Sequence, residues 1–196
     1  MQKIGIIILA AGASTRMNGE PKQLLEFEGK TLLRRAAETA LSSGLRPVVV
    51  VLGANAEKLL PEIKGLPVLP AINENWASGM GGSIKTGLSV LLAENRGIEA
   101  TILMLCDQPF VTAETLNRLV ETFQKTKKPI AACQYSDTIG VPTLFAREMF
   151  AELSDLQGDA GAKAVIKKHA DIAQTPAPEA AFDVDTQADF QKLSSG

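Results

Sequence analysis

Short runs rich in isoleucine and valine, recurring along the chain up to residue 134, are the feature that most constrains how this sequence can fold. They lie at residues 3–10, 47–52, 67–72, 100–106 and 129–134. Apolar runs of this length without polar alternation are typical of strands buried on both faces, as in a parallel sheet. The sequence therefore predicts a central sheet that needs cover on each side.

Helical patterns lie between these runs. Residues 31–43 place their apolar side chains on one stripe, and apolar residues recur at helical spacing after Gly79 and after Thr112. A weaker helix over 55–64 is interrupted by Pro61. Strands that alternate with helices predict right-handed βαβ units. The expected fold is an α/β three-layer sandwich with a mostly parallel, Rossmann-like central sheet.

The last third of the chain is less regular. After residue 135 we expect a Gly/Pro turn at 139–142, a short strand and two small helices, together forming a hairpin or lid beside the main sheet. The segment 175–181, rich in proline and alanine, predicts a surface connection. Residues 182–184 are expected to return as a last short strand.

Composition and charge exclude several classes of protein. The chain has 196 residues, of which 45% are hydrophobic and 21% charged, so we expect residues 1–196 to form one globular domain. A net charge of -2 gives no basic field for nucleic acid. The apolar runs fall short of the roughly 20 residues that span a bilayer. We therefore expect a cytoplasmic protein with neither a nucleic-acid nor a membrane partner.

Cysteine, histidine and tryptophan carry little functional signal. Cys106 and Cys133 lack metal-binding spacing and are expected to be buried, reduced thiols. His169, the only histidine, follows two lysines and is expected at the surface. Trp76 could stack on a base or anchor its own loop.

The loop after the first predicted strand contains small residues and two cations. It reads Leu-Ala-Ala-Gly-Ala-Ser-Thr-Arg-Met over residues 9–17, and Pro21 and Lys22 follow soon after. Small residues let backbone N–H groups approach a phosphate chain, whose charge Arg16 and Lys22 could neutralise. The loop matches neither GxGxxG nor GxxxxGK[ST]. Taken alone, it is also typical of a solvated surface loop.

Acidic residues follow another strand and stand near the C-terminus. Asp107 comes directly after the run 100–106, while Asp183 and Asp185 share one face of an extended segment. Magnesium prefers hard oxygen donors and usually takes one or two carboxylates plus substrate phosphates. The structural alternatives are a turn stabilised by Asp107 and a helix N-cap near Asp185. Spacing does not choose between Asp183 and Asp185.

The order and spacing of five motifs make this chain similar to the GT-A-type nucleotidyltransferases, and within them to the molybdenum cofactor cytidylyltransferases. The first motif is the loop at 9–24, which resembles LAAGxSxRMxxxPKxL. The others are Gly-Met-Gly-Gly-Ser at 79–83, Asp-Gln-Pro at 107–109, Gly-Asp-Ala-Gly-Ala at 158–162 and Asp-Val-Asp-Thr at 183–186. The likeness covers nearly the whole chain. The chain departs from the family's usual pattern at Gly82, at Val141 before Pro142, and at Gln187.

The resemblance implies a role for each matching position. Lys22 and Arg16 would be catalytic, Asp107 and Asp185 would bind Mg²⁺, and Asp159 and Gly161 within 135–170 would contact the acceptor. The nucleotide-binding positions would be Leu9, Ala10, Ala11, Gly12, Ser14, Arg16, Lys22, Asn73, Gly79, Met80 and Ser83.

The resemblance also implies a reaction, namely transfer of CMP from CTP to the terminal phosphate of molybdopterin, with release of pyrophosphate. CTP is expected because guanylyl relatives usually carry glycine in place of Ala11. A transient contact with a recipient molybdoenzyme is also expected. One alternative is a sugar- or alcohol-phosphate nucleotidyltransferase, and another is a non-catalytic molybdenum cofactor carrier. A carrier would not need both metal carboxylates.

Overall fold

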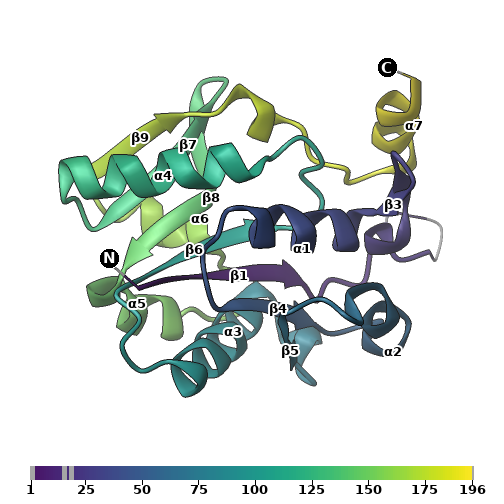
Figure 1. Ribbon diagram of the computed structural model, residues 1–196, viewed down its shortest axis with the longest axis horizontal. Coiled ribbons are helices and arrows are strands. Elements are labelled where there is room, and N and C mark those ends of the chain that lie inside the picture. Colours follow the sequence, from purple (N-terminus) through teal and green to yellow (C-terminus); the bar gives the residue numbers. More distant parts are fainter. Residues whose placement is uncertain (1–2, 15–16, 18–19, 196) are drawn as a thin grey trace.

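Two β-sheets organise the computed structural model, which describes residues 3–14, Met17 and 20–195 (Figure 1). The large sheet has seven strands in the order β5-β4-β1-β6-β8-β7-β9. Their bounds are β1 Ile4–Ala10, β4 Val48–Leu52, β5 Leu69–Ile72, β6 Ala100–Leu105, β7 Ile130–Tyr135, β8 Thr138–Ala146 and β9 Ile172–Pro176. A small hairpin joins β2 (Glu26–Phe27) to β3 (Lys30–Thr31).

The large sheet is mostly parallel, as predicted. Strands β5, β4, β1 and β6 are parallel neighbours, and β9 is parallel to β7. Only β8 runs against its two neighbours, β6 and β7. All five predicted strands are present, with ends that differ from the prediction by at most two residues.

Helices cover both faces of the sheet (Figure 1). The α-helices are α1 Leu32–Ser42, α2 Ala56–Leu59, α3 Met80–Glu94, α4 Ala113–Thr126, α5 Phe150–Ser154, α6 Ala162–Ile166 and α7 Gln187–Ser195. The 3₁₀ helices are η1 Lys22–Leu24, η2 Leu60–Ile63, η3 Trp76–Ser78, η4 Arg147–Met149 and η5 Pro178–Ala181. Helices α1 and α4 pack on one face, and α3, α5 and α6 on the other. None of the described helices is both long and apolar enough to cross a bilayer.

Strand β1 shows why the apolar runs form this sheet. All seven of its residues are buried, and successive side chains point to opposite faces. Ile6 and Ile8 belong to the core beneath α1 and α4, whereas Ile7 and Leu9 belong to the core beneath α3. A strand buried on both sides favours isoleucine and valine throughout. The mostly parallel sheet with helices on both faces confirms the fold class predicted from the sequence.

The predicted turn at 139–142 is wrong, because these residues lie within β8. Pairing with β7 shifts there, from Ala132 opposite Thr143 to Cys133 opposite Gly140. The shift leaves Pro142 in a bulge, where its missing N–H costs no ladder hydrogen bond. The resulting hairpin of β7 and β8 is part of the main sheet and does not lie beside it. The two predicted small helices are present as α5 and α6.

The C-terminal segment also differs from the prediction. Residues 175–181 are not simply a surface connection, since β9 extends to Pro176 and the side chains of Ala177 and Ala180 are fully buried. Residues 182–184 form no strand. Strand β6 already pairs with β1 and β8, so it offers no free edge. The backbone N–H of Val184 instead donates to the carbonyl of Asp107 at 2.9 Å.

Candidate functional site

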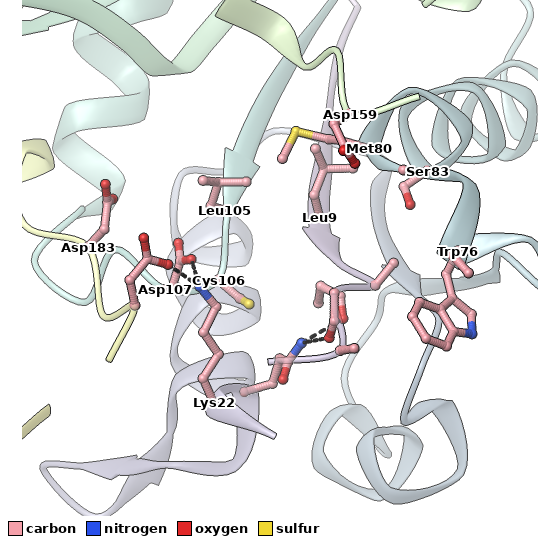
Figure 2. A pocket seen from close by; sticks show the side chains of 18 residues that line it. Leu9, Lys22, Trp76, Met80, Ser83, Leu105, Cys106, Asp107, Asp159 and Asp183 are labelled. Atoms are coloured by element: carbon pink, nitrogen blue, oxygen red, sulfur yellow. Dashed lines mark hydrogen bonds and ion pairs between the residues drawn. The ribbon is translucent and has the colours of Figure 1, made fainter. Parts of the chain in front are cut away.

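A cavity of about 520 Å³ opens beside the carboxyl ends of β1 and β6 (Figure 2). Ligands of open α/β sheets bind at this edge. The predicted site residues that line the cavity are Leu9, Ala10, Ala11, Gly12, Lys22, Gly79, Met80, Ser83, Asp107, Asp159 and Asp185. Ser14, Asn73 and Gly161 lie outside this lining, and Arg16 lies outside the described residues. The structure thus brings most of the predicted positions together.

Lys22 lies between the two predicted metal ligands, Asp107 and Asp185. It begins η1, and its Nζ donates to Asp185 Oδ1 at 2.8 Å and to Asp107 Oδ2. The Lys22 side chain is 17% exposed. Burial alone would lower the pKa of Lys22, but the charge of Asp107 and the hydrogen bonds to both carboxylates outweigh burial and raise it. Lys22 is therefore a fixed positive charge at neutral pH.

Asp183 lines the same end of the cavity without an ion pair to Lys22. Burial, followed by the negative charge of Asp107, raises the pKa of Asp183 to about 6. A bound cation would oppose this shift, because it favours the ionised carboxylate. Asp185 contacts Lys22 and Asp183 does not, and Asp185 stays the second metal ligand that the family resemblance predicts.

The residues around Lys22 fit a magnesium ion held by two carboxylates. Asp107 Oδ1 is buried and has no hydrogen-bond partner in the described part of the chain. A buried, unpartnered carboxylate oxygen is costly unless a cation or donor occupies its vicinity. Within the described ranges, no three or more His, Cys, Asp or Glu side chains form a metal cluster. Magnesium needs only one or two carboxylates when water and phosphates complete its shell.

Ser14 and Gln23 hold the loop that follows β1. The Ser14 hydroxyl accepts a hydrogen bond from the backbone N–H of Lys22 and donates to Gln23 Oε1, both at 3.0 Å. Gln23 Nε2 donates to the carbonyls of Ala10 and Gly12 at 3.1 and 2.9 Å. Sequence reasoning missed Gln23, although it directly follows Lys22. Ser14, which the family resemblance predicts to contact the nucleotide, braces the loop that positions Lys22.

The loop at 158–161 packs against the start of α3. The N–H of Gly81 donates to the carbonyl of Gly158 at 3.0 Å. A Cβ on Gly79 would lie 2.2 Å from the carbonyl carbon of Gly158, so this approach requires glycine. Gly79 also has a φ of +108°, which further favours glycine. The packing places Asp159, predicted on the acceptor side, in the wall that includes Met80.

The charged groups of the cavity lie mostly on one side, and Asp159 beside Met80 is the acidic residue labelled near Ser83. Figure 2 shows Lys22, Asp107 and Asp183 together on one side, and Ser83 with Trp76 on the other. Asn73 lies behind Ser83, and its amide Nδ2 donates to Ser83 Oγ at 3.0 Å. This arrangement suits an elongated ligand with an anionic end and a neutral, polar end.

The cysteines, the tryptophan and the histidine were predicted to carry little functional signal. Cys106 and Cys133 are free and buried, as predicted, and burial raises the pKa of each thiol to about 12. Trp76 lines the cavity, which is compatible with either of its predicted roles. His169 Nε2 lies 2.6 Å from Glu152 Oε2, and His169 is not part of the cavity lining.

Comparison with known proteins identifies the family. Residues 6–173 match the model of the "MobA-like NTP transferase domain". Nicotine blue oxidoreductase of Paenarthrobacter nicotinovorans is 32% identical over 196 residues, which cover 95% of this chain and 94% of that protein.

Solved structures share the fold over the full chain. The crystal structure of Rv0371c from Mycobacterium tuberculosis H37Rv has a TM-score of 0.85 at 28% identity and covers 100% of this chain and 99% of that one. The same protein in complex with manganese has a TM-score of 0.83 at 28% identity, with 100% of each chain covered. Together with the family match, these likenesses show that the chain belongs to the MobA-like NTP transferase domain family, within the nucleotidyltransferase superfamily.

Proposed function

We propose that this protein is a magnesium-dependent cytidylyltransferase that works in the cytoplasm as one domain. It transfers CMP from CTP to the terminal phosphate of molybdopterin and releases pyrophosphate, forming molybdopterin cytosine dinucleotide. The observation that carries the proposal is the Lys22 ammonium bound to Asp107 and Asp185 at one end of the cavity. Nucleotidyl transfer requires cations at this position because negative charge develops on the leaving pyrophosphate.

The charge of the cavity supports metal dependence. Its described lining contains four carboxylates, Asp107, Asp159, Asp183 and Asp185, against the single ammonium of Lys22. A nucleoside triphosphate carries several negative charges and would be repelled by this excess unless it brought cations with it. Asp107 and Asp185 would hold Mg²⁺, which would supply Lewis-acid polarisation of the triphosphate.

The chain's own groups have distinct tasks in the reaction. The backbone at Leu9–Gly12 would hold the nucleotide, while Lys22 would leave its carboxylate partners and bind the phosphates. Because its pKa is raised, Lys22 acts as a charge and not as a base. An acceptor phosphate oxygen forms a bond to the α-phosphorus of CTP as the bond to the bridging oxygen of pyrophosphate breaks. The attacking phosphate is largely a dianion at neutral pH, so no general base is needed.

Molybdopterin is the acceptor that we propose. Family resemblance supports molybdopterin, with residues 135–170 on the acceptor side and a transient contact with a recipient molybdoenzyme. Asp159 and Gly161 remain the proposed acceptor contacts, although Asp159 shares a wall with Met80. A sugar- or alcohol-phosphate acceptor would use the same chemistry at Lys22.

The relative named nicotine blue oxidoreductase supplies a second candidate, an oxidoreductase activity. Its 32% identity over 95% of this chain is the observation that favours it. We prefer nucleotidyl transfer because the contacts of Lys22 with Asp107 and Asp185 suit a metal-bound polyphosphate. An oxidoreductase would change the redox state of its substrate without consuming CTP.

The test is a transfer assay with α-labelled CTP, magnesium and molybdopterin. The proposal predicts that label enters the acceptor while pyrophosphate is released in equal amount. ATP, GTP and UTP, and separately sugar and alcohol phosphates, serve as competing substrates. Label transfer from none of the four nucleotides to any acceptor, with redox turnover of a dye substrate, would overturn the proposal and favour the second candidate.

A further inference from the structure

Asn73 is a buried amide whose orientation can be assigned from its hydrogen bonds. It follows β5 and is 6% exposed. The backbone N–H of Asn75 donates to Asn73 Oδ1 at 3.1 Å. Because a backbone N–H can only donate, the oxygen of the amide must face Asn75. The amide nitrogen then faces Ser83 Oγ, 3.0 Å away, and Ser83 must accept this hydrogen bond.

This contact determines what Ser83 can offer a ligand. A hydroxyl has one proton, and with its oxygen accepting from Asn73 that proton is available for donation. None of the described residues accepts it, and Ser83 lines the cavity (Figure 2). Ser83 is also 5% exposed, so water reaches it poorly. The hydroxyl therefore has a proton that it can donate into the cavity.

We infer that Asn73 is a specificity-determining positioning residue, which makes Ser83 a donor to an acceptor atom of the nucleotide base. This inference rests on the proposed function, since it concerns the base of the same nucleotide. Cytosine offers two adjacent acceptors, O2 and N3, whereas the corresponding edge of guanine offers the donors N1–H and N2–H₂. Guanine N1–H could donate only to the remaining lone pair of Ser83 Oγ, which leaves the Ser83 proton without an acceptor and costs affinity. The arrangement favours CTP over GTP.

The predicted role of Asn73 changes accordingly. Family resemblance implies that Asn73 contacts the nucleotide, but both ends of its amide are already hydrogen-bonded and it does not line the cavity. Asn73 acts through Ser83, and Ser83 touches the base. The two residues should therefore behave as one unit in binding experiments.

Asn73→Asp is the sharpest test because it nearly preserves the shape of the side chain but replaces the amide nitrogen that donates to Ser83 with a carboxylate oxygen that accepts. The carboxylate can still accept from the N–H of Asn75, but it would take the Ser83 proton and leave only lone pairs facing the base. We expect the ratio of CTP to GTP affinity, measured by calorimetry with magnesium and without an acceptor, to fall at least tenfold. The control Asn75→Asp adds the same charge at an exposed position two residues away and should leave the ratio within twofold.

Ser83→Ala provides an independent readout if Asn73→Asp does not fold. It should also lower the CTP to GTP ratio at least fivefold, and adding Asn73→Asp to it should change the ratio no further. An unchanged ratio in either folded single variant, or a wild-type protein that binds GTP more tightly than CTP, would overturn the inference. If the wild-type protein binds no nucleotide, the proposed function fails as well. If it binds nucleotides and only the ratios fail to move, the proposed function stands and the role of Asn73 does not.

Discussion

The ammonium of Lys22 lies 2.8 Å from Asp185 Oδ1, although 163 positions of sequence separate the two residues. The same ammonium also pairs with Asp107. A lysine cation thus lies between the two carboxylates that we propose as magnesium ligands. The Lys22 ammonium offsets the repulsion between these like charges, and on our proposal it would move when a metal and phosphates bind. On our proposal, Lys22 and the metal would therefore compete for the same two carboxylates.

Replacing Lys22 by methionine should separate the effect of the lysine charge on turnover from its effect on magnesium binding. Turnover should fall at least tenfold, or ~1.4 kcal/mol, because a positive charge is lost from the transition state. Without nucleotide, however, magnesium should bind more tightly, because no ammonium competes for Asp107 and Asp185. Calorimetric magnesium titration measures this affinity, and circular dichroism checks folding. Unchanged or weaker magnesium binding in a folded Lys22→Met protein would show that the lysine and the metal do not share these carboxylates.

Gly79→Ala should destabilise the packing of the 158–161 loop, which contributes Asp159 to the cavity wall. A residue other than glycine is strained at a φ of +108°, and the new Cβ would meet the backbone of Gly158. We expect thermal unfolding to show a loss of about 2 kcal/mol. Gly12→Ala is the matched control, since its Cβ would meet nothing within 4 Å. Equal stabilities for the two variants would mean that the 158–161 loop does not pack against α3 in solution.

Glu179 should make folding stability depend on pH. Burial alone would raise the pKa of Glu179, but hydrogen bonds from Thr115, the backbone and Arg118 outweigh it, and the pKa is lowered. A lowered carboxyl pKa contributes stability that is full above its ordinary value near 4.5 and is lost as the pH falls through the lowered value. Because the Arg118 side chain is 35% exposed, we expect only about 1 kcal/mol.

Urea unfolding of Glu179→Gln at pH 7 and at successively lower pH measures this contribution. The variant should be less stable than wild type at pH 7, and the difference should shrink as the pH falls below 4.5. Glu121→Gln removes an exposed carboxylate on α4, the helix that carries Thr115 and Arg118, and is the control that should match wild type throughout. A difference between Glu179→Gln and wild type that stays constant with pH would assign the loss to packing and not to charge.

The sequence predicted the sheet well because strands buried on both faces leave a strong apolar signal. It failed at Pro142, where a bulge lets proline sit in a central strand, since strand register depends on a partner far away in sequence. It also failed at 182–184, because an apolar segment cannot reveal that β6, the strand before Asp107, is already paired on both sides. Local pattern identifies a strand, but pairing decides where it can lie.

The sequence also predicted only some of the residues of the candidate site. Loops at strand ends made Lys22 and Asp107 visible, and family resemblance favoured Asp185 over Asp183. No local pattern could show that Asn73 faces Ser83 or that Gln23 ties down the carbonyls of the first loop. These side chains act on other protein groups, and their partners become apparent only after the chain has folded.

Pyrophosphate release across a magnesium titration tests the central claim most directly. Asp107→Asn and Asp185→Asn each keep the side chain's shape but remove the charge that a hard cation requires. We predict that each variant abolishes magnesium-dependent release from CTP while the core stays folded. The double variant should lose no more than either single one, because both residues serve the same metal. Wild-type turnover and magnesium response in Asp185→Asn would make Asp183 the next candidate ligand. The same result in Asp107→Asn would contradict the nucleotidyltransferase account itself.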